Sequence, residues 1–172
     1  EQARQARVAK FVQIGTVCAY PKHASIPFRE DALWDGYPEE TNAPYGVAKR
    51  ALLVMLDAYR REFDLASAFL LPANLYGTGD NFDLESSHVI PAIVRKVLEA
   101  QASGASEVAL WGDGTPTREF LHVRDAAEAF CLAAERVDEP VPINVGNGRE
   151  LSIAELAGLI RLILGRLKHG GR

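Results

Sequence analysis

The segment Pro44-Tyr45-Gly46-Val47-Ala48-Lys49 opens a long stretch whose apolar residues recur at intervals of three and four as far as Phe63. That period predicts an amphipathic helix over Tyr45–Phe63. Residues four apart lie on one face of a helix, so the phenol of Tyr45 and the ammonium of Lys49 face the same space. A fixed cation favours the ionised form of a nearby phenol, and such a pair can move protons. The same spacing also occurs on solvated helix surfaces, so the rest of the sequence has to decide.

Apolar runs rich in β-branched and aromatic residues flank this helix. Val8–Ile14 ends at Gly15, and Leu65–Leu71 ends at Pro72. Such runs predict buried parallel strands, and the order strand, helix, strand predicts a right-handed crossover. Doubly wound α/β folds bind ligands at the edge where parallel strands end. We therefore expect a ligand-binding edge just beyond Ile14 and Leu71.

The remaining sequence alternates loops with shorter elements. Ser152 and Glu155 have the spacing of a capping box, Asp125 is expected to cap a helix, and Cys131, in mid-helix, is expected in the core. The expected elements are an ordered loop over Ala19–Pro44, helices over Val89–Ala100, Ala126–Val137 and residues 153–164, and strands over Val108–Trp111, Arg118–Val123 and Ile143–Gly146.

The composition is that of an ordinary globular chain. Its 172 residues are 48% hydrophobic and 24% charged, enough for a domain with a real core and without a predicted membrane span. The net charge of −4 argues against a nucleic-acid partner. Cys18 and Cys131 are far apart and lack ligand spacing, which argues against a metal site or a disulfide framework and suits a reducing cytoplasm.

Five motifs, taken in order, resemble the extended short-chain dehydrogenases of the NAD-dependent epimerase/dehydratase family that act on nucleotide sugars. Among them, the GDP-L-fucose synthases are the most similar group. The resemblance covers nearly the whole chain. The motifs are Gly15-Thr16-Val17-Cys18, Tyr45-x-x-x-Lys49, Pro72-Ala73-Asn74-Leu75-Tyr76-Gly77, Ser87-His88-Val89-Ile90-Pro91 and the segment Trp111–Val123.

This resemblance implies a Rossmann-like fold, a doubly wound parallel sheet with a small α/β substrate-binding subdomain. Residues 1–87 are expected to form the C-terminal part of the NADP-binding domain, and residues 88–172 mostly the subdomain, with residues 119–146 partly returning to the first. The family's glycine-rich turn, which holds the cofactor pyrophosphate, does not occur in this sequence. We therefore expect a central and C-terminal fragment that is inactive alone, and the residues that choose between NADPH and NADH are missing.

The resemblance also implies an activity: NADPH-dependent 3,5-epimerisation and 4-reduction of GDP-4-keto-6-deoxy-D-mannose to GDP-L-fucose, by a cytoplasmic homodimer. Tyr45 is implied to donate a proton to O4, Lys49 to assist it and bind the nicotinamide ribose, and Thr16 to bond the carbonyl oxygen. Cys18 and His88 are implied to exchange the protons on C3 and C5, which are acidic because both carbons flank the C4 ketone.

Binding roles follow from the same resemblance. Lys96 stands where some members have an arginine. The implied substrate contacts are Lys96, Trp111 and Arg118, and the implied contacts with NADP(H) are Ile14, Gly15, Thr16, Val17, Lys49, Pro72, Ala73, Asn74, Leu75 and His88.

Other interpretations remain open on the sequence. Thr16 could be a turn hydroxyl, and Cys18 a small buried apolar residue. A 4,6-dehydratase shares the tyrosine and lysine but usually has an Asp-Glu pair after its threonine, where Val17 and Cys18 stand here. A 4-epimerase has the same core and does not need the Cys and His pair. A noncatalytic remnant or an interaction domain is the alternative outside the enzymes.

Overall fold

The structure, a computed structural model, describes residues 1–169, which fold into two compact units. The first unit comprises Glu1–Leu75 and Leu121–Gly148, and the second comprises Tyr76–Phe120 and the chain from Arg149 onward. The predicted boundary after residue 87 therefore falls inside the second unit. The binding role assigned to each part stays a prediction.

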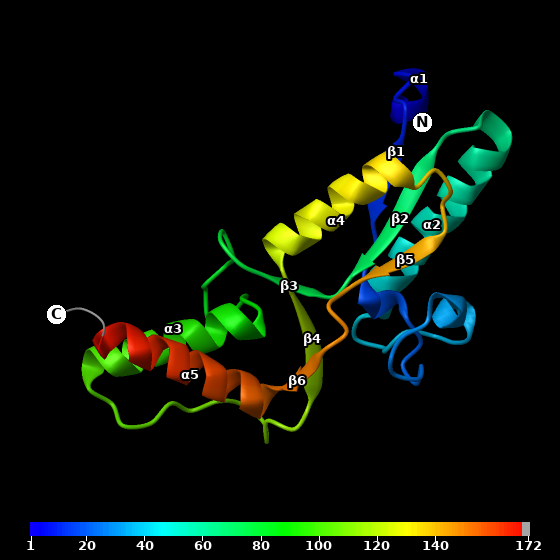
Figure 1. Ribbon diagram of the computed structural model, residues 1–172. Helices are drawn as coiled ribbons and strands as arrows, with labels where there is room; N and C mark the ends of the chain where they lie inside the picture. Colours follow the sequence, from blue (N-terminus) through cyan, green and yellow to red (C-terminus); the bar gives the residue numbers. More distant parts are fainter. Residues whose placement is uncertain (170–172) are drawn as a thin grey trace. The chain divides into compact units, whose positions relative to one another are not determined.

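The first unit is built on a parallel sheet with the strand order β1-β2-β5 (Figure 1). Its strands are β1 (Phe11–Ile14), β2 (Ser67–Pro72) and β5 (Pro142–Val145). Helix α2 (Ala43–Phe63) connects β1 to β2, and α4 (Val123–Arg136) precedes β5. The α/β class and the parallel crossover predicted from the sequence are confirmed.

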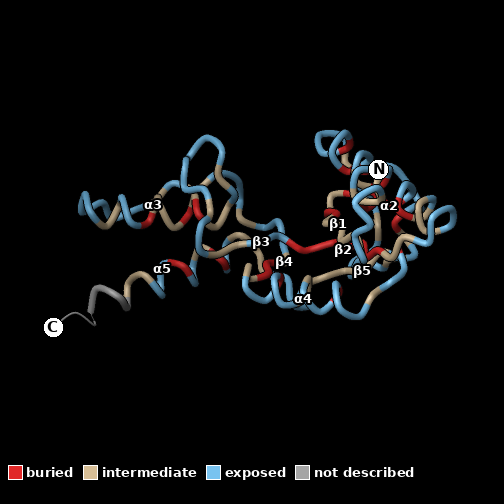
Figure 2. Tube along the Cα trace, turned by 90° about the horizontal axis from the view of Figure 1, so that it is seen from above, coloured by how far each residue is buried: buried red, intermediate tan, exposed pale blue. Residues whose placement is uncertain are grey.

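Strand β2 is the centre of this unit, and every one of its residues is buried (Figure 2). Because side chains alternate along a strand, Phe69 and Leu71 pack with α2 residues, while Ala68 and Leu70 pack with Ala133 of α4. The two helices therefore cover opposite faces of the sheet. An apolar run without alternation is what a strand buried on both faces requires.

The carboxyl ends of β1 and β2 meet at one edge of the sheet, because Ile14 pairs with Leu70 in parallel register. The chain leaves β1 through Gly15, whose amide donates to the Leu70 carbonyl at 2.6 Å. A Cβ on Gly15 would lie 2.8 Å from the Phe69 ring and 2.9 Å from the side chain of Leu71. Only glycine fits here, so the chain turns close over the core and places Thr16 at the predicted edge.

Short helical turns complete the first unit. Helix α1 (Gln2–Gln5) precedes β1, and two 3₁₀ turns, η1 (Val17–Ala19) and η2 (Glu30–Trp34), interrupt the stretch predicted as one continuous loop.

The second unit contains two helices and most of a small sheet of strand order β3-β4-β6, in which β3 begins and β4 ends with residues of the first unit. The helices are α3 (Val89–Ser103) and α5 (Ile153–His169), and the strands are β3 (Asn74–Tyr76), β4 (Thr117–His122) and β6 (Glu150–Ser152). The core consists of Ile93, Val97, Phe120, Leu156 and Ile160. The predicted capping box is confirmed, since the Glu155 amide donates to Ser152 Oγ at 3.1 Å and the Ser152 amide donates to Glu155 Oε2 at 2.8 Å.

Three local predictions are wrong. Val108–Trp111 forms a loop and no strand. Its apolar residue Val108 packs against the core between α3 and α5, which explains the apolar run without a strand. Helix α4 begins before Asp125 and is capped by His122, whose Nδ1 accepts from the Arg124 amide at 3.3 Å. Cys131 is exposed on α4 instead of buried.

Candidate active site

Thr16 stands at the beginning of η1, directly after the sheet edge, and is 9% exposed. Its Oγ1 accepts a hydrogen bond from the Cys18 amide at 3.2 Å. This bond fixes the hydroxyl at the N-cap of the turn and leaves the hydroxyl hydrogen for another acceptor. Thr16 is therefore a turn hydroxyl, as the simpler interpretation held, and its bond to a substrate carbonyl stays a prediction.

Tyr45 and Lys49 lie on one face of α2, as the spacing predicts. The Lys49 ammonium is 5.5 Å from the centre of the Tyr45 ring, and it donates to the carbonyl of Ile14 at 2.9 Å. The lysine thus ties its helix to the last residue of β1. Its ammonium has three donors, so two remain for other acceptors. Tyr45 is 52% exposed, which leaves its ring accessible to a ligand.

Gly46 brings the helix against the turn that carries Cys18. A Cβ on Gly46 would meet the Cys18 carbonyl oxygen at 2.5 Å and the Ala19 Cα at 3.2 Å. The missing side chain therefore allows backbone to pack on backbone at the residue after Tyr45. Sequence reasoning did not single out Gly46, although a glycine inside a strongly helical pattern is a signal of close packing.

Arg50 is the second residue that sequence reasoning missed, because it was assigned to the polar face of the helix. It is only 8% exposed. Its Nε donates to the Ala19 carbonyl at 2.6 Å, and its Nη1 donates to the Gly36 carbonyl at 2.8 Å. Burial lowers the pKa of Arg50 from its usual value. A buried arginine looks the same as a surface arginine in a hydrophobicity pattern.

The segment after η1 is tied to β5 through Tyr20 and Asn144. The Tyr20 hydroxyl donates to Asn144 Oδ1 at 2.8 Å, and its ring stacks on Phe28 with the centroids 4.5 Å apart. The Asn144 amide in turn donates to Glu30 Oε1 at 2.9 Å. Burial of the phenol, opposed by the bond to Asn144, raises the pKa of Tyr20 to about 12. This tyrosine is structural and stays neutral in the physiological range.

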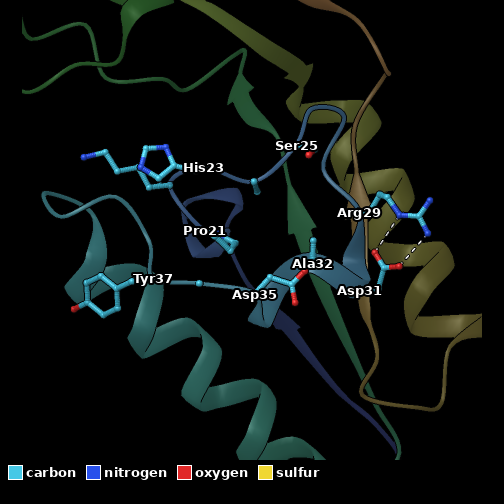
Figure 3. Close-up of a pocket in the computed structure, with 11 residues that line it drawn as sticks. Pro21, His23, Ser25, Arg29, Asp31, Ala32, Asp35 and Tyr37 are labelled. Carbon is cyan, nitrogen blue, oxygen red and sulfur yellow. Dashed lines mark hydrogen bonds and ion pairs between the residues drawn. The ribbon is translucent and has the colours of Figure 1, made fainter.

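A hollow of about 510 Å³ lies beside this segment, lined by residues between Pro21 and Tyr37 (Figure 3). Arg29 and Asp31 face each other across an ion pair of 2.9 Å on its wall. None of the predicted catalytic residues lines this hollow. It is a feature of the loop and not of the sheet edge.

The first unit therefore brings together Thr16, Cys18, Tyr45 and Lys49 around one junction. Cys18, in η1, is half-buried. Pro72 ends β2 at the edge where Ile14 ends β1, and the chain continues from there through Ala73 and through Gly15. Pro72 and Ala73 are buried, and Asn74 and Leu75 are exposed. The sequence predicted this grouping because both segments follow parallel strands.

The second unit carries the other predicted site residues. His88 is exposed and forms the N-cap position of α3. The Lys96 ammonium donates to the Ala109 carbonyl at 3.1 Å and lies 5.3 Å from the centre of the Trp111 ring. Trp111 is 89% exposed. Arg118 is also exposed and donates to the Thr117 carbonyl at 2.7 Å. The joint action of Cys18 and His88 stays a prediction.

Two further observations concern the described part of the chain only. Among these residues, His, Cys, Asp and Glu side chains form no group of three that could hold a metal ion. None of the described helices combines the length and the apolar character needed to cross a membrane.

Comparison with known proteins identifies the family. The model of the NAD dependent epimerase/dehydratase family matches residues 1–146. This chain belongs to that family. A GDP-L-fucose synthase of Sinorhizobium fredii is 42% identical over 158 residues, covering 92% of this chain and 50% of the relative. The GDP-L-fucose synthase of Escherichia coli is 42% identical over 172 residues, covering 95% of this chain and 54% of the relative. The chain thus spans about half the length of the curated relatives it matches.

Solved structures give the same result. A GDP-L-fucose synthetase from Naegleria fowleri, also solved with NADP bound, superposes with a TM-score of 0.87 at 28% identity. The match covers 95% of this chain and 52% of that chain. The resemblance to GDP-L-fucose synthases drawn from the sequence motifs is confirmed, and so is the Rossmann-like fold.

Proposed function

We propose that this chain supplies the catalytic and substrate-binding part of an NADPH-dependent GDP-L-fucose synthase, which epimerises GDP-4-keto-6-deoxy-D-mannose at C3 and C5 and reduces it at C4. The observation that carries the proposal is the junction of α2 with η1. There, Lys49 is bonded to Ile14 beside Tyr45, and Gly46 packs on the carbonyl of Cys18. The identity to GDP-L-fucose synthases supports this choice of substrate.

In this proposal, Thr16 and Tyr45 act on the sugar carbonyl oxygen. The Thr16 hydroxyl, held in place by the Cys18 amide, donates a hydrogen bond to O4. Tyr45 donates its proton to O4 as the ketone becomes an alcohol, and the Lys49 ammonium stabilises the phenolate that remains. The carbonyl of Ile14 holds that ammonium in place, so the positive charge does not depend on the substrate for its position.

The residues present fit the nicotinamide end of NADP(H). Lys49 keeps donors for the ribose hydroxyls, and the backbone of Ile14–Val17 and Pro72–Leu75 lines the edge where both strands end. When bound, the cofactor supplies the hydride that reduces C4. The sequence contains no glycine-rich turn for the pyrophosphate, so these residues hold only part of the molecule.

Epimerisation uses the same carbonyl contacts. Loss of a proton from C3 or C5 gives an enolate, whose oxygen accepts the hydrogen bonds from Thr16 and Tyr45. Cys18 and His88 are proposed to remove and return these protons. Val17 and Cys18 follow Thr16 where a 4,6-dehydratase usually has an acidic pair, and this favours epimerisation over water elimination.

The test is NADPH oxidation by the complete gene product with GDP-4-keto-6-deoxy-D-mannose, followed by identification of the product. Tyr45→Phe is expected to abolish reduction. Tyr59→Phe is the matched control, because Tyr59 lies on the same helix and donates its hydroxyl to Glu1. A product with unchanged C3 and C5 would make the enzyme a 4-reductase or 4-epimerase and contradict the proposal.

The two thiols separate the epimerisation step from reduction. Cys18→Ser is expected to slow uptake of solvent deuterium at C3 and C5 more than it slows reduction. Cys131→Ser, at an exposed position of α4, serves as the control. Deuterium uptake at the wild-type rate in Cys18→Ser would leave Cys18 a packing residue.

We also propose a homodimer in the cytoplasm for the complete protein, with α2 and α3 in the interface. Sedimentation that shows only monomer at every concentration would contradict the dimer.

A further inference from the structure

Arg50 is a buried cation whose partners are backbone carbonyls. It donates to Ala19 and Gly36, and its guanidinium carbon lies 5.5 Å from the centre of the Trp34 ring. No ion pair to Arg50 occurs among the described side chains, those of residues 1–165, and its Nη2 is buried without a hydrogen-bond partner. Only 8% of the surface of Arg50 is exposed to solvent.

This arrangement is costly for the fold. Removing a cation from water is unfavourable, and no carboxylate offsets that cost here. An apolar side chain of similar size would avoid it. The guanidinium gives the site something that an apolar side chain lacks, namely two directed hydrogen bonds from one rigid plane.

The first of these bonds acts on the catalytic junction. Gly46 packs on the Cys18 carbonyl, and Arg50, one helical turn later, donates to the carbonyl of Ala19. Lys49, between them, donates to the Ile14 carbonyl. Helix α2 therefore contacts the backbone before η1, inside it and at its end. These contacts hold the η1 turn against the surface of α2.

We propose that Arg50 is a positioning residue for the active site, which holds the η1 turn, and with it the Thr16 hydroxyl and the Cys18 thiol, against the helix that carries Tyr45. The proposal deepens the function proposed above and rests on it for its catalytic consequence. The second bond, to the Gly36 carbonyl, connects the loop that follows η1 to the same guanidinium. Arg50 therefore bonds to the backbone at the end of η1 and again farther along this loop.

Lysine cannot replace this geometry. Its single nitrogen can reach the carbonyl of Ala19 or that of Gly36, whereas the planar guanidinium reaches both and stacks on Trp34. Arg50→Lys should therefore retain part of the function of Arg50, and Arg50→Met should retain none of it.

The first measurement follows the turn directly. In the complete gene product, the rate of alkylation of Cys18 by iodoacetamide is read by peptide mass spectrometry, with the exposed Cys131 as internal reference. Arg50→Met is expected to raise the Cys18 rate about tenfold, as the loss of a charged hydrogen bond that closes the turn predicts. Arg61→Met is the matched control, because Arg61 lies on the same helix and is 77% exposed at its side chain. Equal Cys18 rates in the two variants would overturn the proposal.

The second measurement separates positioning from general stability. Arg50→Met is expected to lower kcat about 100-fold, the effect of displacing catalytic groups by about an ångström. Arg50→Lys should recover part of kcat. Ala133→Gly, on α4, weakens that helix on the face of the sheet opposite α2, so it lowers stability and should keep kcat.

The outcomes distinguish the two proposals. A wild-type enzyme that does not turn over the ketosugar contradicts the proposed function, and the alkylation rates alone then decide whether Arg50 holds the turn. An active wild type whose kcat is unchanged in Arg50→Met, or falls equally in Ala133→Gly, overturns the positioning role while the proposed function stands.

Discussion

Replacing Gly46 by alanine sets two effects of opposite sign against each other. Alanine is the better helix former by about 1 kcal/mol, because glycine loses more backbone entropy on folding. The new Cβ, however, would lie 2.5 Å from the Cys18 carbonyl oxygen, where ordinary van der Waals contact begins at 3.4 Å. Helix and turn must therefore separate by about 0.9 Å, and overpacking of this kind costs about 1–3 kcal/mol. We expect Gly46→Ala to be neutral to destabilising by about 2 kcal/mol, the difference of the two effects.

The matched control is Gly158→Ala. Gly158 also lies inside a helix, α5, and a Cβ there would meet nothing within 4 Å. Alanine should stabilise this site by up to about 1 kcal/mol. Urea unfolding of the two variants and the wild type, followed by far-ultraviolet circular dichroism, gives the comparison. If Gly46→Ala gained as much stability as Gly158→Ala, the helix would not press on the Cys18 carbonyl, and our account of the junction would be refuted.

The same substitution carries a catalytic prediction. A displacement of about 0.9 Å moves the turn with Thr16 and Cys18 away from Tyr45, and misplacement on this scale lowers turnover by about 100-fold. NADPH oxidation by the complete gene product measures it. Full activity in a variant that is also destabilised would show that the clash relaxes elsewhere in the helix.

Three further predictions concern pH and cofactor binding. Burial raises the pKa of Tyr20 to about 12, whereas the pKa of a tyrosine in the unfolded chain is about 10. The neutral phenol therefore contributes fully to the free energy of unfolding below about pH 10, and this contribution is lost between about pH 10 and 12. Tyr20→Phe should remove this alkaline loss of stability from unfolding curves measured against pH. The hydrogen bond and charge of Lys10 lower the pKa of Asp138 below 3.8 in the folded chain. The ion pair therefore stabilises the fold above pH 3.8, and its contribution is lost as the pH falls through the folded-state pKa of Asp138. In acid, the urea midpoint of Asp138→Asn should fall less than that of the wild type. The 172-residue chain alone should bind NADPH weakly or not at all in a fluorescence titration, because the residues that hold the pyrophosphate are missing, and micromolar binding with turnover would contradict this.

Features that depend on local spacing could be predicted from the sequence. The helical period placed Tyr45 and Lys49 on one face, and the capping box at Ser152 and Glu155 forms as written. The fully buried β2 was also predictable, because a strand covered on both faces must be apolar at every position. In each case, the residues that determine the structure are neighbours in the chain.

Features that depend on distant segments could not be predicted in this way. Arg50 is buried because the loop segments with the carbonyls of Ala19 and Gly36 pack against it. The residue pattern within α2 does not indicate this packing. Cys131 lies one residue beyond Phe130, about 100° around the helix, and is exposed although its neighbours in sequence are apolar. Val108 is half-buried against a core formed by α3 and α5. Its apolar character comes from this packing, and in the sequence it has the same pattern as a short buried strand.

The motif on α2 is better understood as two adjacent columns than as one pair. Tyr45 and Lys49 form the column that a ligand can reach, and Gly46 and Arg50, displaced by one residue, form the column that packs on η1. The packing column has to begin with glycine, since any side chain there would push the turn away from Tyr45. It has to continue with a long donor, since the Ala19 carbonyl lies farther along the turn. The position of Tyr45 and Lys49 relative to Thr16 is thus set by the neighbouring column of Gly46 and Arg50.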